Sequence, residues 1–523
     1  MKAPKQLPFG EKKNIPPNPM KLTLSTAFVC IRFKPRHYLQ PLPRWLSTSQ
    51  RLAQSPRPTT APKQFPNIKH IRQNVQIYTE NCIDRNYKAQ ASSPAKIASL
   101  AEESNEVTRS LLAPRARLND LSKQIAKAQA ATQPESDGLD SALKEASELA
   151  TIVKEAEERK AQCDDEAHKL ALSMPNLTNP QTPREEQRIL SYINYQPGQG
   201  REYSSSADHA TIGRTLSLLD FSSASTTSGW GFYYLINEGA LLEQALIQYA
   251  LAVAMRHGWH AVSPPSVVYS HIADACGFQP RDQNDEQQIW QIEQLDKDKG
   301  KPRRSLAATA EIPLAGLYAG KDIPEPLLPV KLVGSSRCYR AEAGARGVDT
   351  RGLYRVHEFT KVEMFAWTNA PESSGVDLLS PEWTRHSSVV FDEMVGIQTE
   401  ILTSLGLPCR VLEMPSTDLG ASAYRKIDIE ALFPSRMSRE GGWGEVTSTS
   451  ICTDYQSRRL DTRIKDKSGK RNRFPHTVNG TAMAIPRVLA AILEHGWRVA
   501  EGVVIVPEVL RPFMAGLKVI GPK

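Results

Sequence analysis

Residues 337–365 read RCYRAEAGARGVDTRGLYRVHEFTKVEMF, and this stretch decides the fold. It predicts a strand, a polar connection rich in glycine, and a second strand. Because alternate side chains lie on one face of a strand, Arg340 and Glu342 are expected to share a face of the first. The even positions of the second strand are largely apolar: Tyr354, Val356, Val362 and Met364. The odd positions carry nearly all the chemistry: Arg355, His357, Phe359, Lys361 and Glu363. One face is therefore expected to pack and the other to bind.

The connection between the two strands has the composition of a mobile, anion-binding loop. It holds three charged residues among three glycines: Arg346, Asp349, Arg351, Gly344, Gly347 and Gly352. Four residues of strand separate Phe359 from Glu363, a span of roughly 13 Å. That span fits a stacked base at one end and a small ammonium group at the other. The alternative is a surface hairpin of ion pairs, since many such networks are purely structural.

This stretch resembles motif 2 of the class II aminoacyl-tRNA synthetases, and its form RAEAG…DTRGLYRVHEF.KVE resembles the seryl-tRNA synthetases. The resemblance implies that Arg340 binds the α-phosphate of ATP, with Ala341 beside it. It also implies that Glu342 meets an amine of ATP, that Phe359 stacks on adenine and that Glu363 contacts serine.

The charge of the chain is concentrated at its start. The formal net charge is +8 over 523 residues, but residues 1–65 hold twelve Lys or Arg and one acid, Glu11. No Asp or Glu lies between Glu11 and Glu80. This composition predicts a disordered mitochondrial targeting leader, with Met1 or Met20 as the start and a cleavage point near residues 44–47. A basic tail of another kind, on a cytosolic enzyme, is the alternative.

Cysteine usage and hydropathy narrow the class of protein. Seven cysteines lie far apart with no CxxC pair, which fits a reducing compartment and predicts neither a disulfide framework nor a zinc site. No apolar run approaches the ~18 residues that a membrane span needs. We therefore expect a protein that does not enter a membrane. The length of 523 residues predicts two or three domains.

Residues 95–174 predict two long helices around a polar break at 133–138. Apolar residues recur at three-four spacing in both halves, which predicts an antiparallel coiled-coil hairpin with arms roughly 50 Å long. Pro114 should kink the first helix. Seryl-tRNA synthetases carry such an arm here and grip the tRNA with it; residues 119–125 and the exit at 174–177 resemble theirs. Five basic residues are candidates for phosphate contacts, with a solvated helix face as the alternative: Arg109, Arg115, Arg117, Lys123 and Lys127.

Three further stretches resemble elements of the same family. A helix from 239 to about 257, followed by a short strand, resembles motif 1, which implies a homodimer; Leu241 departs from the family pattern. Thr309, Ala310 and Glu311 resemble the TxE element that contacts serine. Residues 445–456 resemble the strand whose Glu445 and Ser448 hold ATP-bound magnesium, with Val446 and Thr447 also at ATP. Thr447, Thr449 and Ile451 replace the family's usual residues here.

Residues 476–489 resemble motif 3, a strand that leads into a helix. The resemblance implies that Arg487 meets the γ-phosphate and that Asn479 and Thr481 line the serine pocket. Pro486 stands where the family usually has glycine, although proline suits a first helical turn. A buried structural arginine is the alternative for Arg487.

Together these features predict an α+β fold: a class II antiparallel β-sheet flanked by helices, with an N-terminal antiparallel two-helix coiled-coil arm. The expected divisions are a leader (1–65), a tRNA-binding helical arm (66–180) and a catalytic domain (181–523). We expect a mitochondrial matrix member of the family that uses ATP, Mg²⁺, L-serine and tRNA(Ser), with Arg340 and Arg487 as its catalytic residues. Adenylate formation needs positioning and charge neutralisation more than a protein nucleophile. The alternative is a catalytically silent, synthetase-like RNA-binding or scaffold protein.

Overall fold

The computed structural model describes residues 61–129, 136–198, 207–278, 288–342, 352–373, 375–471 and 473–522. The predicted leader up to residue 60, residues 133–135 of the polar break, and the connection residues Arg346, Asp349 and Arg351 lie outside these ranges. Glycines 344 and 347 lie outside them too, whereas Gly352 is described. The predictions for the leader and for the anion-binding loop therefore remain predictions.

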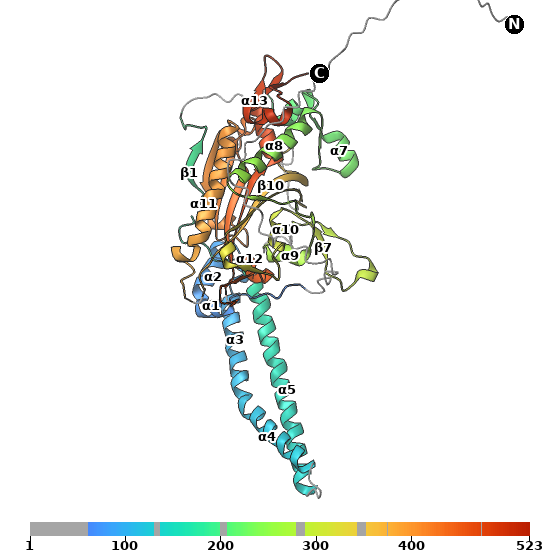
Figure 1. Cartoon of the computed structure of the whole chain (residues 1–523), viewed down its shortest axis with the longest axis vertical. Coiled ribbons are helices and arrows are strands. Elements are labelled where there is room, and N and C mark those ends of the chain that lie inside the picture. The colour runs from blue at the N-terminus through green and yellow to red at the C-terminus, as the bar shows by residue number, and fades with distance from the viewer. Residues whose placement is uncertain are drawn as a thin grey trace, which may run out of the picture. The chain divides into compact units, whose positions relative to one another are not determined.

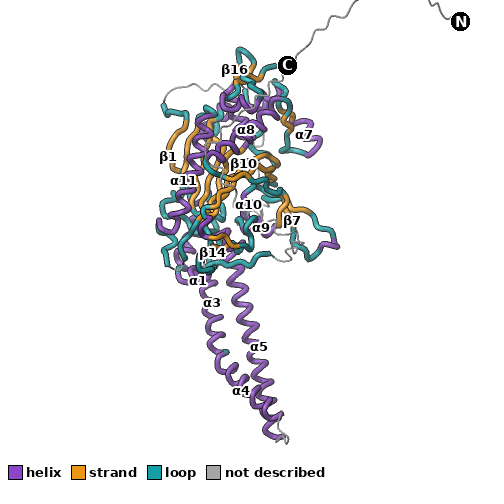
Figure 2. The backbone as a smooth tube through the Cα atoms, in the orientation of Figure 1, coloured by secondary structure: helices purple, strands orange, loops and turns teal. Residues whose placement is uncertain are grey.

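An eight-stranded sheet forms the centre of the fold (Figures 1 and 2). Its strands lie in the order β1 (Arg188–Ile193), β11 (Cys409–Glu413), β12 (Arg425–Leu432), β13 (Trp443–Thr453), β15 (His476–Ala484), β10 (Glu358–Thr368), β9 (Val330–Tyr339) and β4 (His260–Ala261). All neighbours are antiparallel except the edge pair of β4 and β9. The predicted antiparallel sheet is confirmed, with one parallel edge.

The predicted strand pair of residues 337–365 is the hairpin of β9 and β10, in which Tyr339 faces Glu358. Its boundaries differ from the prediction, because β9 ends before Arg340 and Glu342. The Arg340 N–H still donates to the His357 carbonyl at 2.8 Å, and the backbone turns away after it: Ala341 N–H donates to the Gln288 carbonyl at 3.1 Å, and Glu342 has a left-handed φ of 47°. The prediction that both residues lie on the strand is therefore wrong.

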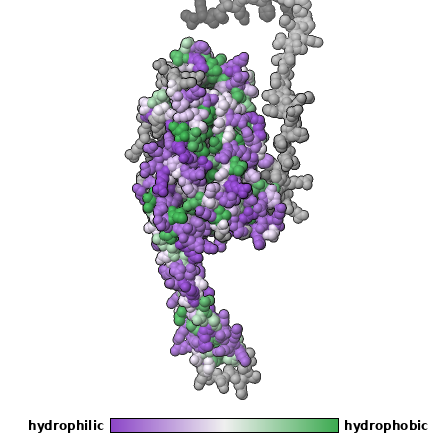
Figure 3. All heavy atoms as spheres, turned by 90° about the vertical axis from the view of Figure 1, so that its left-hand side faces the viewer, coloured by the Kyte–Doolittle hydropathy of each residue, from purple (hydrophilic) through white to green (hydrophobic). Residues whose placement is uncertain are grey.

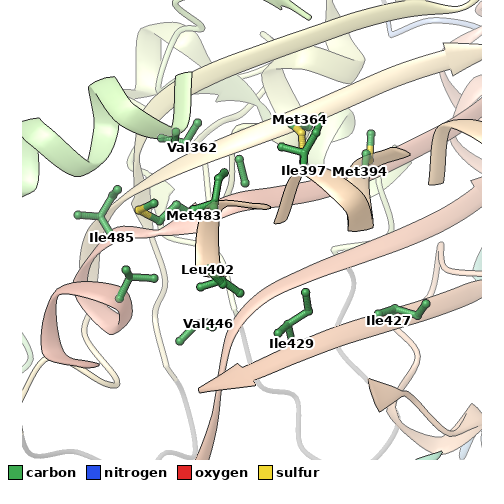
Figure 4. Close-up of a cluster of buried hydrophobic side chains, with 14 of the residues drawn as sticks. Val362, Met364, Met394, Ile397, Leu402, Ile427, Ile429, Val446, Met483 and Ile485 are labelled. Carbon is green, nitrogen blue, oxygen red and sulfur yellow. The ribbon is translucent and has the colours of Figure 1, made fainter. Parts of the chain in front are cut away.

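Alternation along β10 separates core from cavity. Val362 and Met364 are fully buried among apolar side chains of neighbouring strands and α11 (Figure 4). Lys361 and Glu363, which alternate with them in sequence, carry the charges of the opposite face. Tyr354 and Val356 precede the strand, and Val356 packs with Cys338 and Phe359 instead of continuing the alternation.

Three long helices cover the sheet: α8 (Glu238–Arg256), α11 (Pro381–Ser404) and α13 (Ile485–Gly496) (Figure 1). α11 is bonded to two strands by one buried side chain, because Gln398 Nε2 donates to the carbonyls of Ser448 and Thr481 at 3.0 and 2.9 Å. α8 and β4 confirm the predicted helix and short strand of motif 1. Leu241 on α8 is 53% exposed.

Shorter elements complete the fold. The helices are α6 (His209–Thr215), α7 (Phe221–Ser228), α9 (Ser270–Ala275), α10 (Glu311–Gly316) and α12 (Tyr455–Leu460). The strands are β2 (Leu219–Asp220), β3 (Tyr234–Leu235), β5 (Val267–Tyr269), β6 (Gln291–Ile292), β7 (Arg304–Leu306), β8 (Asp322–Pro324), β14 (Arg463–Lys465), β16 (Trp497–Arg498), β17 (Val503–Ile505) and β18 (Val519–Ile520). Within the described residues, no helix combines the length and the apolar character that crossing a membrane requires.

The predicted helical hairpin is confirmed. It consists of α3 (Ser93–Ser110) and α4 (Leu112–Gln129) alongside α5 (Ser136–Ser173) (Figures 1 and 2). The first arm is interrupted at Leu111, three residues before Pro114, whose ring nitrogen cannot donate to the preceding turn. Most of the surface that the hairpin shows in Figure 3 is hydrophilic.

A buried arginine connects the base of this hairpin to the sheet domain. Arg85 follows α2 (Val75–Asp84), which itself follows α1 (Ile68–Gln73), and it is fully buried. Its guanidinium donates to the carbonyls of Asn176, at 2.6 Å, and Ala423, at 2.8 Å, and to that of Gly420. Asn176 in turn donates to the carbonyls of Ser422 and Cys452, each at 2.9 Å. One cation therefore satisfies carbonyls from both parts of the chain.

Arg85→Ala should lower the free energy of unfolding by about 3 kcal/mol, because several buried carbonyls lose a charged donor at once. Urea denaturation measures this loss. Arg72→Ala, at an exposed position on α1, is the control and should change stability by less than about 0.5 kcal/mol. Equal stability of the two variants would contradict the role given to Arg85.

Candidate active site

A cavity of about 670 Å³ lies on the charged face of the sheet and collects side chains from distant parts of the chain. Ten of the predicted site residues line it: Thr309, Glu311, Arg340, Glu342, Glu363, Glu445, Ser448, Asn479, Thr481 and Arg487. Phe359 lines an adjoining pocket that shares Arg340 and Arg487 with the cavity. The Arg340 guanidinium lies 5.3 Å from the centroid of the Phe359 ring, within cation–π range.

Four predicted site residues do not present their side chains to the cavity. Ala310 and Val446 are fully buried, and Val446 lies in the apolar core (Figure 4). The Thr447 hydroxyl donates to the Thr481 carbonyl, and Ala341 is held at Gln288 through its backbone. Any contact of Ala310, Ala341 or Val446 with a ligand must therefore come from the main chain.

A β-bulge explains how Glu445 and Ser448 reach the same cavity. Residues three apart on a regular strand point to opposite faces. Here Ile429 pairs with Thr447 while Glu430 pairs with Glu445, which leaves Val446 as an extra residue in β13. The bulge shifts the alternation by one residue, so that both polar side chains line the cavity.

One end of the cavity is rich in positive charge. Arg487 donates through a terminal guanidinium nitrogen to the Glu445 carbonyl at 2.9 Å and to its carboxylate at 3.2 Å. Burial alone would raise the pKa of Glu445, but the charges of Arg487, Lys426 and Arg340 hold that pKa at about 2. The carboxylate is therefore ionised at any working pH, beside arginines suited to phosphate oxygens.

The other end of the cavity holds buried carboxylates. Glu363 pairs with Lys361 at 2.6 Å and accepts from the Thr481 hydroxyl at 3.3 Å. Glu311, at the start of α10, accepts from Gln456 Nε2 at 2.6 Å. Burial and the nearby charge of Glu363 raise the pKa of Glu311 to about 7. This end therefore carries negative charge that is incompletely compensated, which suits a cationic group.

Sequence reasoning placed Arg355 and Lys361 on the binding face but gave no specific role to them or to Lys426. Lys361 compensates Glu363, Arg355 pairs with Glu342 at 3.2 Å, and Lys426 pairs with Asp428 at 2.6 Å. Burial raises the pKa of Asp428 above its ordinary value, with the charges of Glu445 and Glu430 adding to the effect. The available signal was the i, i+2 spacing of Lys361–Glu363 and Lys426–Asp428, which puts each pair on one face of a strand.

Two of the departures from the family pattern, Ile451 and Pro486, have local explanations. Ile451 is almost fully buried in the core, so it does not alter the cavity lining. Pro486 is the second residue of α13, where its missing N–H is not needed, and it lines the pocket beside Arg487.

Comparison with known proteins identifies the family of the chain. A family model described as the tRNA synthetase class II core domain (G, H, P, S and T) matches residues 292–496, and one described as the seryl-tRNA synthetase N-terminal domain matches residues 67–178. A curated serine–tRNA ligase from Rubrobacter xylanophilus is 37% identical over 459 residues, 87% of this chain and 99% of the relative. The chain belongs to the seryl-tRNA synthetase family.

Two further relatives extend the comparison. The mitochondrial serine–tRNA ligase of Saccharomyces cerevisiae is 45% identical over 350 residues, 66% of this chain and 72% of the relative. The crystal structure of seryl-tRNA synthetase from Pyrococcus horikoshii complexed with ATP has a TM-score of 0.74 at 29% identity, covering 87% of this chain and 99% of that one. As a member of this family, the chain is an ATP-dependent serine–tRNA ligase, and the silent alternative has no support.

The raised pKa of Glu311 predicts a pH-dependent effect on stability. An acid whose pKa rises on folding destabilises the folded state above its unfolded pKa and has no effect below it. Glu311→Gln should therefore increase the free energy of unfolding by about 2 kcal/mol at pH 8 and leave it nearly unchanged at pH 4.

Chemical denaturation at the two pH values measures this difference. Glu363→Gln is the matched control, and it should destabilise the protein because it leaves Lys361 buried without its partner. If Glu311→Gln changes the free energy of unfolding by the same amount at pH 4 and pH 8, burial of ionised Glu311 does not destabilise the folded protein.

Proposed function

We propose that this cavity activates L-serine with ATP and then serves the transfer of serine to the 3′ end of tRNA(Ser). The opposite charge of the two ends of one cavity carries the proposal. Arginines 340 and 487 lie at one end, and buried carboxylates 311 and 363 lie at the other. A scaffold protein would need the fold but not this convergence of charged side chains.

At the phosphate end, Arg340 would neutralise the α-phosphate and Arg487 the γ-phosphate, while Phe359 stacks on adenine and Glu342 accepts from an amine. Glu445 and Ser448 fit a magnesium site, since Mg²⁺ takes one or two protein oxygens and completes its shell with phosphate and water. The low pKa of Glu445 supports this, because a metal ligand must be ionised. When bound, Mg²⁺ supplies charge neutralisation at the phosphates.

At the serine end, Glu311 and Glu363 would bind the α-ammonium group, with Thr309, Asn479 and Thr481 around the substrate. A serine carboxylate oxygen attacks the α-phosphorus, and the bond from that phosphorus to pyrophosphate breaks. A ribose hydroxyl of the tRNA terminus then attacks the carbonyl carbon, and AMP leaves. Both steps require oriented charges and no protein nucleophile, which agrees with the residues in the cavity.

The helical hairpin would hold the tRNA by its phosphates. Three of its candidate arginines form ion pairs within the hairpin: Arg109 with Glu102, Arg115 with Glu157, and Arg117 with Glu145. These pairs are exposed to solvent, which screens them, so a phosphate can replace the carboxylate partner. The resemblance of α8 and β4 to motif 1 leads us to propose that the protein is also a homodimer. A monomeric mass in sedimentation equilibrium would contradict this proposal.

Arg340→Ala should reduce serine-dependent ATP–pyrophosphate exchange by about 10²–10³-fold, because one preorganised charge contributes about 3–4 kcal/mol to a transition state. The fold should persist, as thermal denaturation can show. Arg337→Ala, a half-exposed neighbour on β9, is the control and should keep most of the exchange activity. Near wild-type exchange in Arg340→Ala would contradict the proposed phosphate end.

Replacing residues 98–172 with a short Gly/Ser linker should spare serine activation and abolish tRNA charging at ordinary concentrations. The hairpin lies outside all lining residues of the cavity, so pyrophosphate exchange does not need it. Its phosphate contacts are electrostatic, so tRNA affinity of the intact protein should also fall steeply with salt. Equal loss in exchange and charging would show that the hairpin is a folding element instead.

We also propose that the protein works in the mitochondrial matrix. The basic leader supports this, as do the relatives from S. cerevisiae and Schizosaccharomyces pombe that are named mitochondrial. Residues 1–65 fused to a reporter without its own signal should carry it into the matrix. A reporter that stays in the cytosol would overturn the localisation.

A further inference from the structure

A buried histidine–glutamate pair lies outside the cavity and connects two elements that the reaction uses. His209, at the start of α6, and Glu494, near the end of α13, have side chains only 8% and 1% exposed. Nδ1 of His209 lies 2.8 Å from Oε1 of Glu494, and the His209 backbone N–H donates to the same oxygen at 3.2 Å. Ser435 also donates to Glu494, from its backbone N–H at 3.1 Å and its hydroxyl at 2.7 Å. The carboxylate is thus fully engaged.

The second ring nitrogen of His209 contacts motif 2. The backbone N–H of Leu353 lies 3.0 Å from Nε2. A backbone N–H can only donate, so Nε2 must carry the lone pair and the ring hydrogen must be on Nδ1, where it is donated to Glu494. Glu494 therefore selects the tautomer of His209 that can accept from motif 2.

The preceding glycine makes this contact possible. A Cβ at Gly352 would lie 2.2 Å from Nε2 of His209, and its φ of +78° is a conformation that side chains rarely adopt. The backbone at the end of the motif 2 connection therefore rests directly on the imidazole ring. A side chain at position 352 would clash with the His209 ring and push the backbone away from it.

Tyr354, which follows Leu353, holds the motif 3 arginine, Arg487. The Tyr354 carbonyl accepts from Nε of Arg487 at 3.0 Å, and the Tyr354 ring lies beneath two guanidinium groups, 4.6 Å from Arg487 and 4.0 Å from Arg436. The direction of Arg487 thus depends on where residues 352–354 lie. His209 fixes the first part of that segment.

We propose that His209, oriented by Glu494, is a positioning residue for ATP: it holds residues 352–354 in place so that Tyr354 aims Arg487 at the phosphate end of the cavity. His209 itself lines neither the cavity nor the adjoining pocket. The proposal rests on the phosphate role given to Arg487 in the proposed function.

Two substitutions test the two ring nitrogens of His209 separately. Asparagine places its amide near the position of Nδ1 and can still donate to Glu494, whereas glutamine reaches the position of Nε2 and can still accept from Leu353. His209→Asn should raise the KM for ATP in pyrophosphate exchange by about tenfold, with the KM for serine changed less than about twofold. His209→Gln should keep both KM values within about twofold of wild type.

Asp208→Ala is the matched control. The Asp208 side chain accepts from Thr211 N–H at 2.7 Å and caps the same helix without touching His209's ring contacts. This variant should lower the melting temperature and leave the KM for ATP unchanged. Wild-type ATP kinetics in His209→Asn would overturn the proposal, and so would an equal rise of both KM values in the asparagine and glutamine variants.

A second measurement does not depend on the variants folding. Amide hydrogen exchange of the wild-type protein should show Leu353 protected in the absence of ATP, because its N–H is already bonded to His209. Rapid exchange at Leu353 would overturn the proposal.

Arg487→Ala separates the phosphate role of Arg487 from the positioning role of His209. If this variant keeps a wild-type KM for ATP, the phosphate role of Arg487 fails, whatever the His209 variants show.

Discussion

The burial of two carboxylates on one face of the sheet is the constraint on which the rest of the site depends. Glu363 is neutralised by Lys361, but Glu311 accepts only from neutral amides, among them Gln456 at 2.6 Å, and faces the charge of Glu363. The pKa of about 7 means that ionised Glu311 destabilises the folded protein when no substrate is bound. In the proposed function the substrate's ammonium group would supply the missing charge, which would favour a cationic substrate. Opposite this end, Glu445 has the reverse environment, with cations that hold its pKa at about 2.

Strand register brings these groups together. Residues from 309 to 487 meet in one cavity because β12, β13, β15 and β10 are adjacent. Polar side chains from each of these strands line it: Lys426, Glu445, Ser448, Ser450, Asn479, Thr481, Lys361 and Glu363. The bulge at Val446 is needed because Glu445 and Ser448 would otherwise face opposite sides. Arg85 and Asn176 hold the carbonyls of residues 420–423, which form part of the cavity wall, so the base of the helical hairpin also shapes the site.

Much of this arrangement could be predicted from the sequence because local patterns and a dense resemblance agreed. Three-four spacing predicted the hairpin, the proline predicted its interruption, and alternation on β10 correctly separated Val362 and Met364 from Lys361 and Glu363. The end of β9 was not predictable, because it depends on the backbone of Gln288, which is distant in sequence. The bulge that orients Glu445 depends on the partner strand, and a single strand read alone gives no sign of it. The pairing of His209 with Glu494 joins residues 285 apart, which no local pattern reveals.

The most direct test of the central claim is the number of protons released when a ligand with serine's ammonium group binds. Calorimetric titration at pH 7 with a sulfamoyl analogue of seryl-adenylate, in buffers of different ionisation enthalpy, measures that number. Because Glu311 is half protonated at a pKa of about 7 and must ionise to bind the ammonium, we expect release of about half a proton. Glu311→Gln, which has no carboxyl to ionise, should release markedly fewer. Equal proton release by the two proteins, or none by the wild type, would contradict the account.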